Sequence, residues 1–237
     1  MRIVLKGSPD LRNCIFISGF HGVGLTGFIA VKHLVKCLNA ERIGFIESRF
    51  LPPFISVGDS YIIATPFELF KHDKYVFFIT EFPPHDKEVY QLSQVIADWV
   101  VRSGFSQAIL IGGLDKRFKC SDNVLCKFLV TSAFKRLVSK ELPLLDKGLH
   151  AYGLLALLLA RFEIRDFPAI AVLPYADASR PDPLAAANAI NFLNSFLGLS
   201  IDVSELIRDA ERIESEIKML QQLAKRAKTS HGKTLYM

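Results

Sequence analysis

The residues with the clearest potential for chemistry form a glycine-rich turn near the N-terminus. Residues 19–27 read Gly-Phe-His-Gly-Val-Gly-Leu-Thr-Gly, with a G-x-G-x-x-G spacing at Gly22, Gly24 and Gly27. The turn lies between a short apolar run and a helical pattern, the setting in which this spacing binds the pyrophosphate of NAD or FAD. Glu47 lies 20 residues beyond Gly27, where that fold places its ribose-binding acid. One hypothesis is therefore a nucleotide- or dinucleotide-binding enzyme.

The same glycines have a purely structural interpretation. Glycine permits a tight turn between a strand and a helix, and it lets the helix pack close to the sheet without any bound phosphate. The sequence contains no nucleophile elbow, no P-loop and no second group of residues that would supply substrate chemistry. His21 stands alone in the turn, without an acid partner. We therefore expect no cofactor and no catalytic residues.

Other polar residues follow predicted strands without forming a recognisable site. Glu81, His85, Asp86 and Glu88 could gather beside one strand, although their spacing is not that of metal ligands and Pro83-Pro84 indicates a surface turn. The loop Gly112–Arg117 could bind an anion or simply turn the chain.

The four cysteines are dispersed along the chain: Cys14, Cys37, Cys120 and Cys126. No Cys-x-x-Cys pair is present, so we expect reduced, packed thiols and no metal site.

The last three residues, Leu235, Tyr236 and Met237, form a different kind of candidate site. They combine an apolar side chain, a tyrosine and a carboxylate at the end of a polar segment. A short tail of this kind can enter a preformed pocket, burying Leu235 and Tyr236 while the carboxylate pairs with a basic group.

The elements that would position these groups alternate along the chain. Short apolar strands are predicted at 14–18, 43–46, 61–64, 75–80, 108–111 and 169–173, with Pro174 ending the last one. Helical spacing is predicted at 25–38, 89–101, 151–162 and 183–197, and Gly104 is placed to end the second helix. Lys71–Lys74 indicates a turn, so the runs 61–64 and 75–80 are a hairpin or neighbouring strands. This alternation predicts an α/β fold whose sheet is mainly parallel or mixed, with helices on both faces.

Length and composition indicate one large domain with an appendage. We divide the 237 residues into an α/β domain (1–200), a C-terminal oligomerisation helix (201–228) and a flexible docking tail (229–237). The longest apolar run, 151–160, is too short to span a membrane, and no secretory signal is recognised at the N-terminus. We therefore expect a cytoplasmic protein.

The formal net charge of +5 reflects basic residues near the C-terminus, at Lys218, Lys225, Arg226, Lys228 and Lys233. This run could mark a nucleic-acid surface, but no aromatic residues alternate with the basic ones, and an acidic protein partner explains the run equally well; we expect no nucleic acid partner.

The segment after Asp202 has the pattern of a coiled-coil seam. Its apolar residues are spaced alternately three and four apart, at Val203, Leu206, Ala210, Ile213, Ile217, Leu220, Ala224 and Ala227. The alternative is an amphipathic helix that packs on its own domain. We favour self-association.

Four segments together resemble the proteasome assembly chaperone family in its archaeal form. They are the turn Gly19–Gly24, the loop Ile111–Leu114, the helical segment Tyr152–Leu155 and the strand from Phe167 to Pro174. The resemblance covers nearly the whole chain. Some members of that family end in a hydrophobic-tyrosine-any-residue tail that inserts between proteasome α-subunits, and Leu235, Tyr236 and Met237 match it position by position.

The resemblance implies an α/β fold like that of nucleoside phosphorylases, no established catalysis and a homo-oligomer, with a tetramer as one candidate. It also implies a proteasome core particle α-ring as partner, bound without ATP in an assembly or activating role. Several protomers joined along the seam would present several tails at once, and linked weak contacts strengthen binding.

Overall fold

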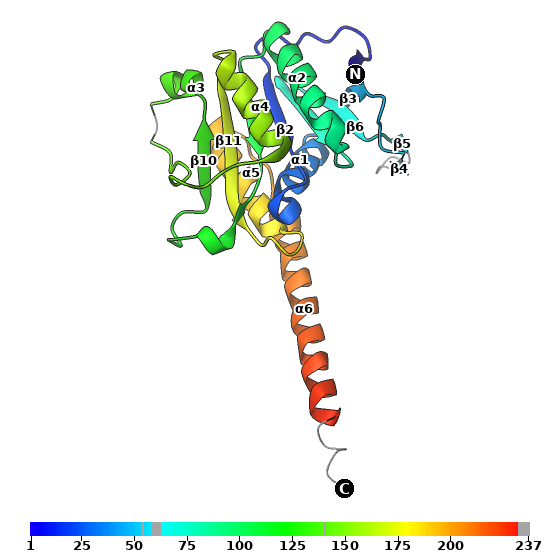
Figure 1. Cartoon of the computed structure of the whole chain (residues 1–237), viewed down its shortest axis with the longest axis vertical. Helices are drawn as coiled ribbons and strands as arrows, with labels where there is room; N and C mark the ends of the chain where they lie inside the picture. The colour runs from blue at the N-terminus through cyan, green and yellow to red at the C-terminus, as the bar shows by residue number, and fades with distance from the viewer. Residues whose placement is uncertain (54, 58–62, 140, 232–237) are drawn as a thin grey trace.

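A computed structural model of the chain describes residues 1–53, 55–57, 63–139 and 141–231, without the side chains of 218 and 220–231. Figure 1 shows a body built around a sheet, from which one long helix, α6 (Ser204–His231), projects. No helix in the described residues is both long enough and apolar enough to cross a membrane.

Nine of the described strands form one sheet in the order β1-β3-β6-β7-β2-β8-β11-β10, and β9 pairs with the end of β11. Their bounds are Arg2–Leu5 (β1), Ile15–Gly19 (β2), Glu41–Glu47 (β3), Phe67–His72 (β6), Tyr75–Thr80 (β7), Gln107–Ile111 (β8), Leu114–Asp115 (β9), Cys126–Val130 (β10) and Ala169–Ala176 (β11). Two short strands, β4 (Ser56–Val57) and β5 (Ile63–Ala64), form a separate hairpin.

The sheet is mixed, with a parallel centre and antiparallel flanks. Strands β7, β2, β8 and β11 run parallel, whereas β1, β3 and β6 on one side and β10 on the other pair antiparallel. The α/β prediction is confirmed, but the sheet is mainly parallel only at its centre. The flanking strands β1 and β10 did not stand out because their apolar residues are interrupted by charged ones, such as Arg2 and Lys127.

Helices cover both faces of the sheet. Helices α2 (Asp86–Arg102) and α4 (Gly153–Ile164) pack on the face that includes Phe16, whereas α1 (Thr26–Cys37) and α5 (Pro183–Leu197) pack on the face that includes Ile17. Successive strand residues point to opposite faces, so a continuous apolar strand such as β2 supplies both cores. The remaining short helices are η1 (Val23–Leu25), η2 (Lys116–Phe118) and α3 (Ser132–Leu137).

Local sequence explains where the helices begin and end. Asp182 caps α5 by accepting a hydrogen bond from the backbone N–H of Ala185, and Pro183 occupies the first turn. Gly198 and Gly104 follow α5 and α2 with φ values of 70° and 75°, the left-handed conformation that ends helices. The prediction that Gly104 ends the second helix is confirmed.

Two sequence predictions about strands were wrong. The hairpin that turns at Asp73 joins β6 to β7, so the partner of β7 is Phe67–His72 and not the run 61–64. Pro174 does not end β11, which continues to Ala176. The pairing of β11 with β8 stops at Val172 and its pairing with β9 starts at Tyr175, so the missing N–H of Pro174 interrupts no ladder bond to these strands.

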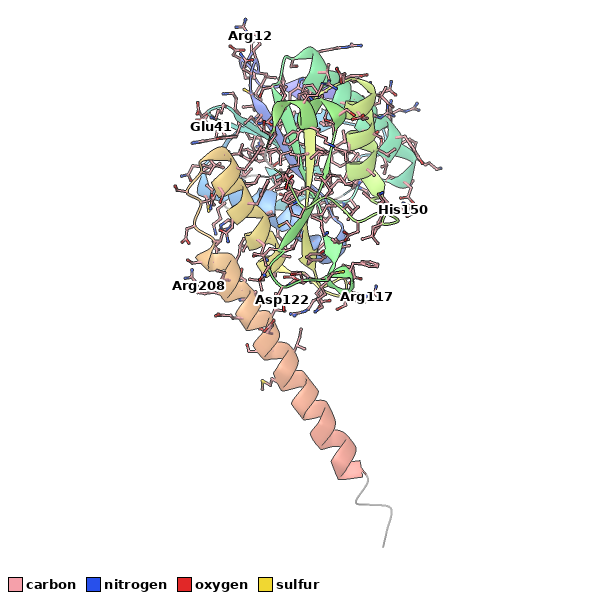
Figure 2. All side chains as sticks on the ribbon, turned by 90° about the vertical axis from the view of Figure 1, so that its left-hand side faces the viewer. Arg12, Glu41, Arg117, Asp122, His150 and Arg208 are labelled. Atoms are coloured by element: carbon pink, nitrogen blue, oxygen red, sulfur yellow. The ribbon has the colours of Figure 1, made fainter. Side chains whose placement is uncertain are left out.

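The first turns of α6 belong to the body. Leu206 is buried against α5 and α1, and Lys36 on α1 donates to the carboxylate of Glu205. The Nε2 atom of His33 lies 2.7 Å from the carbonyl oxygen of Asp202. Arg180, in the loop between β11 and α5, contacts Glu214 at 3.8 Å. The 17 residues of α6 beyond Glu214 extend for about 25 Å, at 1.5 Å per residue. Figure 2 shows this part clear of the body.

Candidate functional site

Close backbone packing and backbone conformation require glycine at most of the glycine positions in this turn. A Cβ atom on Gly27 would lie 2.1 Å from the carbonyl oxygen of Ile111, and one on Gly19 would lie 1.9 Å from the carbonyl oxygen of Gly27. Gly24 has a φ of 64°, a conformation that favours glycine. These three glycines therefore let α1 begin directly against β2 and β8, as the structural interpretation predicts.

Gly22 is different, because no atom lies within 4 Å of the position of a Cβ. It borders a pocket of about 120 Å³ at the edge where the parallel strands β2, β8 and β11 end. The pocket is lined by Phe20–Val23, Gly112–Leu114, Leu145, His150–Leu155 and Leu173. All four segments that carry the family resemblance contribute to this lining.

The pocket is built to hold an apolar group and has little capacity for acid–base chemistry. Its lining residues include two histidines, His21 and His150, but no carboxylate, lysine, arginine or hydroxyl other than that of Tyr152. His21 stacks on Phe28, and its burial, together with the nearby Lys32, lowers the pKa of its imidazole. A neutral His21 without a carboxylate partner does not form a catalytic pair.

The structure separates Glu47 from the glycine turn. Glu47 ends β3, and strands β6 and β7 lie between β3 and β2. The strands predicted at 14–18 and 43–46 are therefore not neighbours, whereas a dinucleotide-binding fold needs its acid on the strand beside the glycine turn. The Glu47 carboxylate instead pairs with Arg2. This arrangement does not favour the dinucleotide hypothesis.

The cations of the loop after β8 are already paired. Arg117 donates to Asp115, and Lys116 donates to Asp177 at 3.0 Å. The hydrogen bonds from Arg117 are the main cause that lowers the pKa of the Asp115 carboxyl. Hydrogen bonds from Ser179, and to a lesser extent from Lys116, lower the pKa of the Asp177 carboxyl. Figure 2 places Arg117 at the end of the body from which α6 leaves. The loop turns the chain and has no cation positioned for an anion.

The polar residues that follow β7 make separate structural contacts and do not form one site. Glu81 pairs with Lys32, and His85 caps α2 by accepting from the backbone N–H of Lys87. Glu88 is buried and accepts from the backbone N–H of Phe50, while its second carboxylate oxygen has no hydrogen-bond partner.

Cysteines and metal ligands give no further site. Cys14 and Cys126 are buried, as predicted, but Cys37, the last residue of α1, and Cys120, in the loop between η2 and β10, are exposed. Within the described part of the chain, no three His, Cys, Asp or Glu side chains are grouped to hold a metal ion.

The residues of the predicted coiled-coil seam fall into two groups in the structure. Leu206 is buried and Val203 half-buried against the chain's own core, as the amphipathic alternative expects, whereas Ala210, Ile213 and Ile217 remain partly exposed along α6. The side chains of Leu220 and Ala224 and the whole tail, Leu235, Tyr236 and Met237, lie outside the described residues.

An exposed apolar hairpin was not predicted. Val57 on β4 and Ile63 on β5 are 69% and 53% exposed, and Ile55, just before β4, is 62% exposed. The run at 61–64 was predicted as a strand, but Ile55 and Val57 were not assigned to one, because Pro52, Pro53 and Gly58 surround them in the sequence.

Comparisons with known proteins place the chain among proteasome-related structures. The model of the PAC2 family matches residues 16–221. A crystal structure of Pyrococcus furiosus PbaA, described as an archaeal homolog of proteasome-assembly chaperone, is 26% identical with a TM-score of 0.83, and the match covers 100% of both chains.

Two further matches agree with this result. P. furiosus PbaB, described as an archaeal proteasome activator, shares the fold at 20% identity, with a TM-score of 0.75 over 92% of this chain and 98% of that one. An uncharacterised protein of Methanocaldococcus jannaschii is 25% identical over 225 residues, or 93% of this chain and 90% of that protein.

Proposed function

The chain belongs to the PAC2 family, and from this premise we propose that it is a non-enzymatic protein that binds the proteasome core particle in an assembly-chaperone or activating role. The observation that carries the proposal is the match to PbaA over the full length of both chains. The fold relationship to nucleoside phosphorylases remains a prediction from the family resemblance.

We propose that the contact with the proteasome α-ring is made by the C-terminal tail. Leu235 and Tyr236 would enter a pocket between α-subunits, and the carboxylate of Met237 would pair with a basic group there. The support is the sequence of the tail and its place in the chain. It follows a helix that extends for about 25 Å beyond Glu214. A tail at the end of such a helix can reach a recessed pocket that the body itself could not enter.

The distal half of α6 would hold several protomers together. Ala210, Ile213 and Ile217 continue the seam beyond the two residues that the body uses, and Leu220 and Ala224 extend it in the sequence. A homo-oligomer of this kind, with a tetramer as one candidate, would bind through several tails at once. The basic residues near the end of α6 would favour an acidic surface beside the pockets.

Co-sedimentation with the cognate proteasome core particle tests the docking mode. Tyr236→Ala removes the aromatic anchor, and a single glycine added after Met237 moves the carboxylate without altering a side chain. We expect both changes to abolish co-sedimentation. Lys233→Ala is a matched change in the same tail that should weaken binding only slightly. Wild-type binding that survives both the Tyr236→Ala change and the added glycine would refute docking through the tail.

A further inference from the structure

The pocket beside the glycine turn lies where the chain leaves two neighbouring strands in opposite directions. Strands β2 and β8 are adjacent and parallel. After β2 the chain passes through α1 to β3 on one side of this pair, whereas after β8 it continues to β9, β10 and β11 on the other side. In an open α/β sheet, the crevice beyond two such strand ends is the usual place for a ligand. The pocket of about 120 Å³, which Gly22 and Gly113 border, lies in this crevice.

The floor of the pocket is apolar. Five lining residues with apolar side chains are buried: Phe20, Leu114, Leu154, Leu155 and Leu173. An engineered cavity of about 150 Å³ with a lining of this kind binds benzene. A volume of about 120 Å³ therefore suits a single ring and is too small for a nucleotide.

Aromatic rings line the pocket nearer the surface. His150 and Tyr152 are exposed and His21 is half-buried, and Figure 2 shows His150 at the surface of the body. Aromatic rings attract one another in offset-stacked and edge-to-face arrangements, in addition to the effect of their apolar area. An aromatic ligand therefore gains more in this pocket than an aliphatic ligand of the same size.

His21 is held in one orientation and keeps one ring nitrogen for a ligand. Its ring stacks on Phe28 with the centroids 4.5 Å apart, and its Nδ1 atom lies 3.4 Å from the hydroxyl oxygen of Thr80. Among the described residues, the Nε2 atom of His21 has no hydrogen-bond partner. A hydroxyl group can either donate to or accept from this nitrogen, so it suits both tautomers of the neutral imidazole.

No charged side chain in the lining would neutralise a charged ligand. The lining contains no carboxylate, lysine or arginine. A charged group that entered the pocket would lose its hydration without gaining a partner of opposite charge, which is unfavourable. The pocket therefore favours an uncharged ligand.

We infer that this pocket binds one uncharged aromatic ring that carries a single hydroxyl group, as in a phenol. The ring lies against the buried floor, and the hydroxyl forms a hydrogen bond with the Nε2 atom of His21. Two sources supply this chemistry: a free phenolic molecule and the tyrosine side chain of a partner protein. The inference requires neither the C-terminal tail nor the proteasome.

NMR titration of the full-length chain with p-cresol tests the ligand class, with the methyl signals of Leu114, Leu155 and Leu173 as the readout. We expect saturable shifts with a dissociation constant of about 1 mM or lower. Toluene, which lacks the hydroxyl, should bind about 5-fold more weakly. The p-toluate anion, which has a carboxylate in place of the hydroxyl, should not bind. Absence of shifts with p-cresol up to about 10 mM, or tighter binding of p-toluate, would overturn the inference.

Two variants that reduce the volume of the pocket test where p-cresol binds. Gly22→Leu adds a side chain where a Cβ would meet no atom within 4 Å, and Ala151→Leu enlarges another lining residue. Each should weaken p-cresol binding by about 10-fold or more. Ala160→Leu, at an exposed position of α4 outside the lining, is the matched control and should have no effect. Unchanged binding to both pocket variants, each shown to be folded by circular dichroism, would overturn the inference because the ligand would then bind elsewhere.

His21→Phe tests the hydrogen bond separately from the packing of the ring. The variant keeps an aromatic ring beside Phe28 but removes the Nε2 atom. The affinity for p-cresol should fall to that for toluene, while the affinity for toluene stays as in the wild type. If p-cresol kept its full advantage over toluene, the assigned role of His21 would be wrong.

N-Acetyltyrosinamide distinguishes the two sources of the ring. It carries the same phenol group on a peptide backbone and has no net charge. Tighter binding than p-cresol would support the tyrosine side chain of a partner protein, whereas weaker binding would support a free phenolic molecule. Both results would support the binding of a phenol ring in this pocket.

Discussion

Replacing Gly27 with alanine tests whether the glycine turn is a packing device. The added Cβ would lie 2.1 Å from the carbonyl oxygen of Ile111 and 2.7 Å from the backbone nitrogen of Phe20. Because side-chain carbons are essentially never found closer than 3.0 Å, the first turn of α1 must move away from β8 by about 0.9 Å. Overpacking of this kind costs about 3 kcal/mol when the obstacle is backbone, since no side chain can rotate away.

The matched control is Gly22→Ala in the same turn. Gly22 has a φ of −123°, outside the left-handed region that favours glycine, and its Cβ would meet no atom within 4 Å. Urea unfolding followed by circular dichroism should show a loss of about 3 kcal/mol for Gly27→Ala and a change within about 0.5 kcal/mol for Gly22→Ala. Equal stability of the two variants would refute the packing argument and return attention to a ligand at the turn.

Three other predictions concern buried groups. Leu206→Ala should lower the free energy of unfolding by about 3 kcal/mol, because Leu206 is buried in the core. Ile207→Ala, at the adjacent and exposed position, should lower it by less than about 1 kcal/mol. Equal losses would show that α6 does not pack on the body as described. Glu68→Ala should cost about 3 kcal/mol in the same unfolding assay, because it leaves the guanidinium of Arg42 without its carboxylate, and a negligible loss would contradict that role. Burial raises the pKa of the Cys126 thiol to about 12 from 9.0, so the unfolded chain releases this proton first and stability falls as pH rises from 9 toward 12. Subtracting the pH profile of Cys126→Ala from that of the wild type should isolate a slope of about 1.4 kcal/mol per pH unit, and identical profiles would refute it.

The central elements of the fold could be predicted because their signals are local. The predicted strand at 108–111 is continuously apolar, and α2 has a helical period that ends just before Gly104. The edge strand β1 and the antiparallel strand β6 contain charged residues and gave no comparable signal. Strand order depends on packing between distant segments, so the separation of β3 from β2 by two strands could not be read from the sequence.

The candidate site shows the same limit. The sequence identified the glycine turn, but only the three-dimensional packing distinguishes the roles of its glycines. Gly22 borders the pocket, whereas Gly24 provides a positive φ and Gly27 allows close backbone packing. The pocket wall at His150–Leu155 lies far along the chain from the turn. The shared, solvent-exposed side of Val57 and Ile63 became visible only once the structure showed that β4 and β5 pair with each other.

Native mass spectrometry of the full-length chain mixed with the cognate proteasome core particle tests the proposed function most directly. We predict a species with the mass of the core particle plus a whole number of protomers, and its loss when residues 235–237 are removed. Absence of that species with the intact chain, under conditions that preserve the core particle, would contradict the proposal that this protein binds the proteasome.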